Sequence, residues 1–212
     1  HTPELHDYLT RSKGSFAATL RGIRNLSDMG MPVMTNTVVT KPNYRHLPEL
    51  ARILISAGVF QYQFAFVHMV GNAEKYALSM APRKSLIMPY IYRGLDVSIY
   101  SGVNVMTEAI PLCFMKGYEA YVAERIMPET KIFDADQVIE SFTESRLTHG
   151  KLKGPPCREC ILCGECEGPW REYPEMPRWD HLAAVRAPRP SPPGRARPRQ
   201  KSGPPETLSI KL

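Results

Sequence analysis

The 212-residue sequence contains no run of about 18 uninterrupted apolar residues, the length that a membrane-spanning helix needs. Its first 20 residues also lack the basic and then apolar order of a secretory signal peptide. These two absences predict a soluble, cytoplasmic protein with no membrane partner. The chain begins with His1 rather than Met, so we expect a fragment or a processed piece of a longer protein.

Most of the chain also lacks excess charge, although the formal net charge is +6. Residues 1–185 contain 20 basic and 20 acidic residues, whereas residues 186–212 contain seven basic residues and one acid, so the tail supplies 7 − 1 = +6. Prolines and a shortage of apolar side chains predict that residues 181–212 form a disordered tail. Its basic residues have no aromatic residues between them, so we do not expect a nucleic-acid partner.

Helical and strand patterns alternate along the folded part. Each of three apolar patterns at helical spacing is followed by a strand-like run, and Ser15 is the expected cap of the first helix. Parallel strands need a crossover helix between neighbours, so the alternation predicts an α/β fold with a parallel sheet. The expected helices are 14–30, 47–58, 85–100 and 116–126, and the expected strands are 33–40, 60–67 and 103–108.

Ligands of parallel sheets bind at the carboxyl ends of the strands, so the residues there are the candidates for function. None is diagnostic alone. Thr37 is a common β-former, and His68 is more simply a hydrogen-bonded structural residue than a catalyst. The candidates are Asn36, Thr37 and Asn43 for the first strand, His68, Gly71 and Asn72 for the second, and Glu108 for the third.

Four of the five cysteines lie within PPCRECILCGECEGPW (155–170) at a strict spacing of three. The odd number and the missing secretory signal argue against a disulfide framework. Two C-x-x-C zinc knuckles are usually separated by about a dozen residues or more, and here they are nearly fused. A ferredoxin motif, C-x2-C-x2-C-x3-C-P, matches at its first three positions only. A metal centre, either iron–sulfur or zinc, is therefore the favoured interpretation.

Five segments occur in the order HDYLTRSKGSF, VMTNTVVT-x2-N, FAFVHMVGNA, VMTEAIPLCFMKGYEAY and CREC-x5-C-x-G-x-W-x2-Y. In this order they resemble the later part of a radical S-adenosylmethionine enzyme with a SPASM or twitch auxiliary-cluster extension, and the match covers roughly residues 1–176. The most specific are IPLCFMKGYE and the cysteine segment. The resemblance implies a partial (β/α)6 barrel, about strands 3 to 6, over residues 1–126, and an auxiliary-cluster region over 127–180, followed by the disordered tail 181–212.

The same resemblance implies the ligands of an auxiliary 4Fe-4S cluster. A cysteine after the last barrel strand joins a C-x2-C-x5-C group, which gives Cys113, Cys157, Cys160 and Cys166 and leaves Cys163 as the spare thiol. In the complete parent protein, S-adenosylmethionine would be the cofactor, with Asn36 or Thr37 at its ribose and with Gly71 and Asn72 near its adenine. The implied partners are a reductant such as flavodoxin or ferredoxin and a substrate that is a peptide or protein.

One family feature is missing from this sequence. The C-x3-C-x2-C loop, which leaves one iron open to bind S-adenosylmethionine, does not occur, so we expect no adenosyl-radical formation by this chain alone. A molybdenum-cofactor type cyclase is disfavoured because its cysteine spacing differs and because this chain ends in SIKL rather than in glycine. The non-enzymatic alternative is a module stabilised by zinc on four cysteines, whose basic tail contacts nucleic acid.

Overall fold

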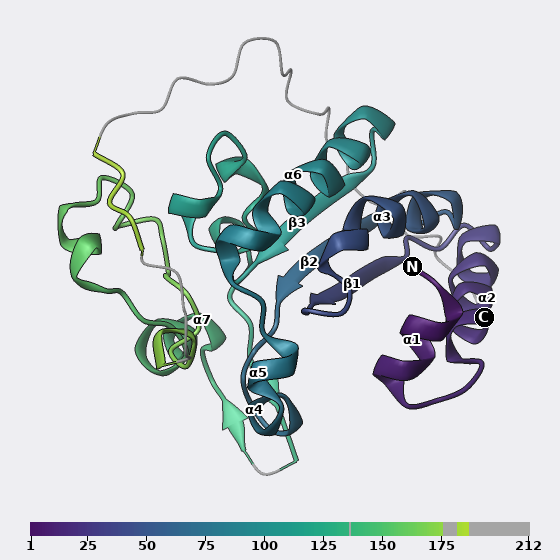
Figure 1. The fold of residues 1–212 in the computed structure, drawn as a ribbon, viewed down its shortest axis with the longest axis horizontal. Coiled ribbons are helices and arrows are strands. Elements are labelled where there is room, and N and C mark those ends of the chain that lie inside the picture. The colour runs from purple at the N-terminus through teal and green to yellow at the C-terminus, as the bar shows by residue number, and fades with distance from the viewer. Residues whose placement is uncertain (136, 176–181, 187–212) are drawn as a thin grey trace, which may run out of the picture.

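The computed structural model describes residues 1–135, 137–175 and 182–186 of a mixed α/β protein (Figure 1). No helix in this part of the chain is long and apolar enough to cross a membrane. The helices are α1 (Pro3–Thr10), α2 (Ser15–Asp28), α3 (Leu47–Ser56), α4 (Asn72–Lys75), α5 (Ala77–Met80), α6 (Lys84–Ser101) and α7 (Phe142–Ser145), and the strands are β1 (Met34–Val39), β2 (Gln61–Phe66), β3 (Asn104–Glu108), β4 (Ile132–Phe133) and β5 (Val138–Ile139).

Strands β1, β2 and β3 form one parallel sheet in that order, as the alternation of helices and strands predicted. Helices α3 and α6 supply the two crossovers and lie together on one side of the sheet (Figure 1). The three described strands form an open sheet, so a partial barrel stays a prediction. Strands β4 and β5 pair separately as a short antiparallel hairpin.

The side of the sheet under α3 and α6 holds the core. Tyr62 and Phe64 of β2 are fully buried, and the Tyr62 hydroxyl donates to the carbonyl oxygen of Gly94 in α6 at 2.8 Å. A Cβ at Gly94 would lie 2.6 Å from the Phe64 ring, so only glycine lets the helix approach this closely. The apolar faces of α3 and α6 therefore explain why alternate residues of the strands are buried.

The other side of the sheet is more exposed, and we call it the open face. Successive side chains along a strand point to opposite faces of the sheet, so the residues next to Tyr62 and Phe64, and those paired with them on β1 and β3, point to the open face. The parallel register places Asn36 beside Gln63, and Ala65 beside Glu108. The open face carries Met34, Asn36 and Val38 from β1, Gln61, Gln63 and Ala65 from β2, and Asn104, Met106 and Glu108 from β3.

The predicted helix over 116–126 is wrong. This segment forms two short 3₁₀ turns, η3 (Glu119–Tyr121) and η4 (Ala123–Arg125). Gly117 has a φ of 78°, and the Thr107 hydroxyl of β3 donates to the carbonyl oxygen of Tyr121 at 3.2 Å. Val122 also forms an isolated parallel bridge with Thr107. The segment returns along the edge of β3, and these pairings replace helical hydrogen bonds.

The expected cap of the first long helix is also corrected. Gly14 precedes α2 in a left-handed conformation, and Ser15 is already the first helical residue. The carboxylate of Asp7 in α1 accepts hydrogen bonds from the backbone N–H groups of Gly14 and Phe16 and from the Ser15 hydroxyl. A side chain seven to nine residues upstream thus satisfies the helix N-terminus, which local sequence signals do not reveal.

The cysteine segment docks on the carboxyl ends of the strands. This segment, residues 155–170, follows α7 and the π-helical turn η5 (Arg146–Gly150) and begins with the 3₁₀ turn η6 (Pro155–Glu159); a further 3₁₀ turn, η7 (Tyr173–Glu175), comes after it. Trp170 and Tyr173 are buried, and the Trp170 indole N–H donates to the carbonyl oxygen of Phe66, the last residue of β2, at 3.3 Å. Two rings that follow the cysteines therefore fasten this segment to the sheet.

Residues 182–186 fall within the predicted tail, yet they pack against the cysteine segment. Leu182 and Val185 are buried, and the N–H of Ile161 donates to the carbonyl oxygen of Val185 at 2.9 Å. The tail prediction was based on composition and missed these two apolar side chains. Its remaining residues, 181 and 187–212, lie outside the described residues.

Candidate metal centre

All five cysteines line a single small pocket, and none of them forms a disulfide. Cys113 comes from the 3₁₀ turn η2 (Leu112–Phe114), five residues after the end of β3, and the other four come from the cysteine segment. The structure therefore brings Cys113 together with cysteines that follow it by 44 to 53 residues. Cys113 is half-buried and lines the pocket together with the other thiols.

The backbone around the cysteines favours thiolates at the predicted ligands. The N–H of Val185 donates to Cys160 Sγ at 3.4 Å. The backbone of Ala183 lowers the pKa of Cys113, that of Gly154 lowers the pKa of Cys157, and those of Leu112 and Gly168 lower the pKa of Cys166, in each case against the larger effect of burial. N–H groups near sulfur stabilise thiolates and tune the metal that they bind.

The electrostatics of the pocket disfavour free thiolates. Burial raises the pKa of Cys113, Cys157 and Cys166, and neighbouring thiols add to the effect, while the backbone N–H groups oppose it. A metal cation reverses this balance, because a coordinating thiol loses its proton outright. The shared pocket and the backbone groups that oppose the effect of burial therefore suit the chemistry of a thiolate-ligated metal centre.

Cys163 differs from the other four thiols in how the chain holds it. It also lines the pocket, but the contact that fixes it involves its carbonyl oxygen, which accepts from Lys153 Nζ at 2.7 Å. Lys153 also lowers the pKa of Cys166, as a minor contribution against burial. The predicted role of Cys163 as the spare thiol stays a prediction, and its position keeps it within reach of the same centre.

The thiols are not arranged around one point. Within the part of the chain that the structure describes, no three His, Cys, Asp or Glu side chains are gathered closely enough to hold a single ion. The cavity between the thiols measures about 20 Å³, close to the space of one water molecule. Zinc with Zn–S bonds of about 2.3 Å would require the thiols to close in. A larger iron–sulfur cluster would require the cysteine side chains to rotate outward. The pocket therefore suits a metal centre through the thiols that line it, and not through its volume.

Gly168 fixes the turn after the last cysteine. Its φ is 88°, and a Cβ at this position would lie 2.3 Å from the carbonyl oxygen of Leu152. The neighbouring strand-like bridge between Lys151 and Trp170 needs this close approach. A Cβ at Gly164, by contrast, would have no neighbouring atom within 4 Å, so packing requires a glycine at 168 and not at 164.

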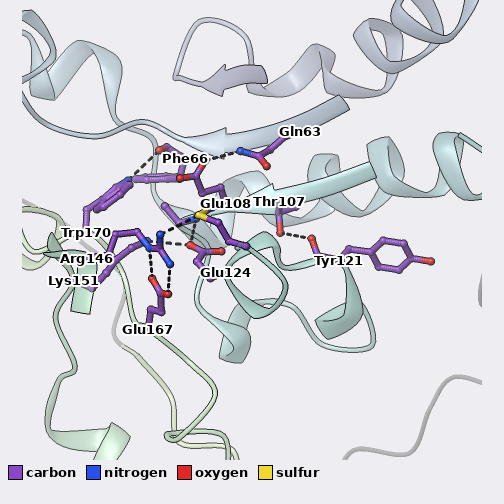
Figure 2. A network of polar contacts seen from close by, with 12 residues as sticks. Gln63, Phe66, Thr107, Glu108, Tyr121, Glu124, Arg146, Lys151, Glu167 and Trp170 are labelled. Carbon is purple, nitrogen blue, oxygen red and sulfur yellow. Dashed lines mark hydrogen bonds and ion pairs between the residues drawn. The ribbon is translucent and has the colours of Figure 1, made fainter. Parts of the chain in front are cut away.

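A buried polar network supports the cysteine segment from behind (Figure 2). The Arg146 guanidinium donates to both carboxylate oxygens of Glu167, at 3.0 and 2.8 Å, and this glutamate directly follows Cys166. Lys151 Nζ contacts Glu124 Oε1 at 3.1 Å and lies 3.8 Å from the centre of the Trp170 ring. The network links the cysteine segment to the end of β3.

Sequence reasoning missed this network apart from its strand-end member, Glu108. A charged residue stands out as a candidate for a special role only when it is buried, because charged side chains are rarely buried. The local sequence does not indicate that Glu124, Arg146, Lys151 and Glu167 are buried. Their residue types and spacings are those of ordinary surface charges.

The four predicted cofactor contacts lie in different places. Asn36 and Thr37 are neighbours on β1, so Asn36 is on the open face and Thr37 is on the helix-covered face. Both border a cavity of about 260 Å³ between β1, α1, α2 and α3. Gly71, with a φ of 57°, precedes α4, and Asn72 borders a separate cavity beside α1.

Two other strand-end candidates have structural contacts. Asn43 holds the turn after β1, where its amide accepts from the N–H of Thr40 and donates to the carbonyl oxygen of Val38. The His68 ring stacks on Trp170 with centroids 4.0 Å apart, and Nε2 lies 3.4 Å from the Glu172 carboxylate. Asn43 therefore holds the turn after β1, and His68 holds the loop after β2 against Trp170.

Comparison with models of known protein families gives no match to this chain. A search of curated proteins gives no match either. The resemblance to radical S-adenosylmethionine enzymes therefore stays a prediction.

Proposed function

We propose that this chain is the later part of a radical S-adenosylmethionine enzyme and that its cysteine segment holds an auxiliary 4Fe-4S cluster. The observation that supports the proposal most is that Cys113 lines the same pocket as Cys157, Cys160 and Cys166, although it lies 44 residues before the first of them. These are the four ligands that the resemblance implies, and Cys163 lines the pocket as well.

When bound, the cluster would supply electron transfer or a binding point for the substrate. The chain's own residues hold the four thiolates, shield them from water and fix the loop against the sheet. In the complete enzyme, S-adenosylmethionine would be bound at the open face, with Asn36 as a contact, and a peptide or protein would be modified. The proposed reductant is flavodoxin or ferredoxin, and the proposed location is the cytoplasm.

The test is anaerobic reconstitution of the full chain with iron and sulfide. We expect about four irons per chain, since four thiolates suit one 4Fe-4S cluster. Cys160→Ala should abolish iron binding, and Cys163→Ala should leave it nearly intact. Stoichiometric zinc without sulfide would instead support the four-cysteine zinc module. Equal losses in both variants would show that the fourth ligand is wrongly assigned.

A second measurement concerns radical chemistry. The chain has no C-x3-C-x2-C loop, so incubation with S-adenosylmethionine and dithionite should release no 5′-deoxyadenosine above a blank without protein. Release well above the blank would contradict the assigned role of the cysteine segment.

A further inference from the structure

Lys153 is the only residue with a charged side chain among the described residues that line the cysteine pocket. Its Nζ donates to the carbonyl oxygen of Cys163, which lines the same pocket, at 2.7 Å. Besides the five cysteines and Gly168, the other lining residues are apolar: Pro111, Leu112, Leu162, Leu182 and Ala183. Lys153 therefore brings one positive charge to a pocket that is otherwise lined by thiols and apolar groups.

Two contacts hold the Lys153 side chain beside Cys166, the last cysteine. A Cβ at Gly168 would lie 3.6 Å from Lys153 Cγ, which places the stem of the lysine next to the residue two positions after Cys166. The hydrogen bond to Cys163 holds the ammonium end, three positions before Cys166. The charge of Lys153 also lowers the pKa of Cys166, against the larger effect of burial. The lysine charge therefore acts on this predicted ligand.

The positive charge of Lys153 is not neutralised by a neighbouring acid. Lys153 forms no ion pair with any residue that the structure describes. Glu165 and Glu167 flank Cys166 in the sequence, but each already contacts an arginine, at 2.7 and 2.8 Å. The charge of the lysine is therefore available to a metal centre in the pocket.

A cation in this place acts on the reduction of the centre. Four thiolates give an iron–sulfur cluster a net negative charge, and net charge is one of the features that set its reduction potential. One-electron reduction adds a further negative charge, which an apolar pocket disfavours. A nearby cation stabilises the more negative form by Coulomb attraction. A lysine that lines the pocket should therefore make the cluster easier to reduce.

We infer that Lys153 raises the reduction potential of the metal centre by supplying the positive charge that stabilises its reduced form. This inference rests on the proposed function, and of the two roles given there it favours electron transfer. The centre gains one electron, and the proposed reductant, flavodoxin or ferredoxin, loses one. Lys153 is exposed, so water and salt screen part of its charge. We expect about a threefold to tenfold effect on the equilibrium constant of reduction, and tenfold corresponds to about 59 mV for one electron.

The test is an anaerobic redox titration of the reconstituted full chain, followed by the EPR signal of the reduced cluster. Lys153→Met should lower the midpoint potential. Lys153→Gln can still donate to the Cys163 carbonyl but has no charge, so it should lower the potential as well. Lys153→Arg keeps the charge and should restore the wild-type value.

Arg158→Met is the matched control. Arg158 lies between Cys157 and Cys160 in the sequence and is exposed, but it is not among the residues that line the pocket. Its replacement should leave the midpoint potential unchanged. An equal shift in Arg158→Met and Lys153→Met would show that any cation of the segment has this effect, and it would overturn the specific role of Lys153.

Other results would also overturn the inference. A wild-type potential in Lys153→Gln would show that the hydrogen bond to Cys163 matters and that the charge does not. A wild-type potential in Lys153→Met would show that Lys153 has no effect. Loss of the cluster from both variants would give the lysine a structural role instead; if only Lys153→Met loses it, Lys153→Gln decides.

Iron and zinc contents of the same samples separate this inference from the proposed function. A cluster with about four irons whose potential does not depend on Lys153 would overturn this inference alone. A wild-type chain that binds zinc and has no reducible centre would overturn the proposed cluster and, with it, the role of Lys153.

Discussion

Breaking the buried ion pair behind the cysteine segment should destabilise the protein strongly. Arg146 and Glu167 are 2% and 10% exposed, and the guanidinium contacts both carboxylate oxygens. Arg146→Met keeps much of the side-chain length and removes the charge, which leaves the Glu167 carboxylate buried without a partner. Removing one member of such a pair typically costs about 3–5 kcal/mol, so we expect a loss of about 3 kcal/mol in the free energy of unfolding.

The chain offers a matched control on the other side of the same cysteine. Arg125 contacts Glu165 at 2.7 Å, and Glu165 precedes Cys166 as Glu167 follows it. This pair is 37% and 56% exposed, and exposed pairs contribute about 0–1 kcal/mol. Arg125→Met should therefore change the free energy of unfolding little, although Glu165, like Glu167, is an immediate neighbour of Cys166 in the sequence.

Urea unfolding of the metal-free chain at neutral pH measures both effects. The double variant Arg146→Met/Glu167→Leu should recover most of the loss, because no buried charge is left unpaired. If Arg146→Met costs no more than Arg125→Met, the burial argument is refuted. If the double variant is less stable than Arg146→Met alone, the two side chains act separately, and the network does not support the cysteine segment as a unit.

Three further predictions concern backbone packing and protonation. Gly168→Ala should lower the melting temperature and the iron content, since its Cβ would meet a backbone oxygen at positive φ, whereas Gly164→Ala should change neither. Gly94→Ala should destabilise the fold, because its Cβ would clash with a buried ring, while Gly22→Ala, with open space around it in α2, should stabilise it by about 0.5–1 kcal/mol in urea unfolding. The pKa of Glu108 is raised in the folded state by burial, so the folded protein binds this proton more tightly than the unfolded chain does, and the wild type loses stability as the pH rises above the unfolded pKa. Glu108→Gln has no such proton, so its stability relative to the wild type should increase between pH 4.5 and 8. A stability difference that stays constant across that range would contradict the raised pKa.

The sequence predicted the sheet because its signals are local. Strands 33–40, 60–67 and 103–108 were expected from β-branched and alternating residues, and each observed strand lies inside its predicted range. Parallel pairing followed from the helices between them. These features depend on the spacing of apolar residues within a segment and on the length of the segments between strands, and both can be read from a single sequence.

The segment after β3 shows where local signals fail. Residues 116–126 have the composition of a helix, but Gly117 and the bridge from Val122 to Thr107 direct the chain back along the sheet. The same limit applies to Asp7, which caps α2 from outside the helix. In both cases a partner distant in sequence supplies hydrogen bonds that the helical pattern would otherwise have supplied.

The metal centre was only partly predictable. Spacing identifies Cys157 and Cys160 as a knuckle, but the approach of Cys113 was expected only from the resemblance. Nothing in the composition of the tail indicated that the N–H of Val185 donates to Cys160 Sγ, or that the backbone of Ala183 lowers the pKa of Cys113. N–H to sulfur bonds depend on backbone position rather than on residue type, so they become visible only in the fold.

The docking of the cysteine segment explains why its aromatic residues follow the cysteines at a short distance. Trp170 donates to the end of β2, and the Tyr173 hydroxyl accepts from the N–H of Lys84, the first residue of α6. Cys113 follows β3, the strand beside β2, so both anchors bring Cys166 to the edge where Cys113 lies. Four thiols at a spacing of three could not reach Cys113 without these anchors. The cysteine segment therefore depends on the sheet for its fifth thiol, and a peptide of residues 150–175 alone should bind metal with a different ligand set.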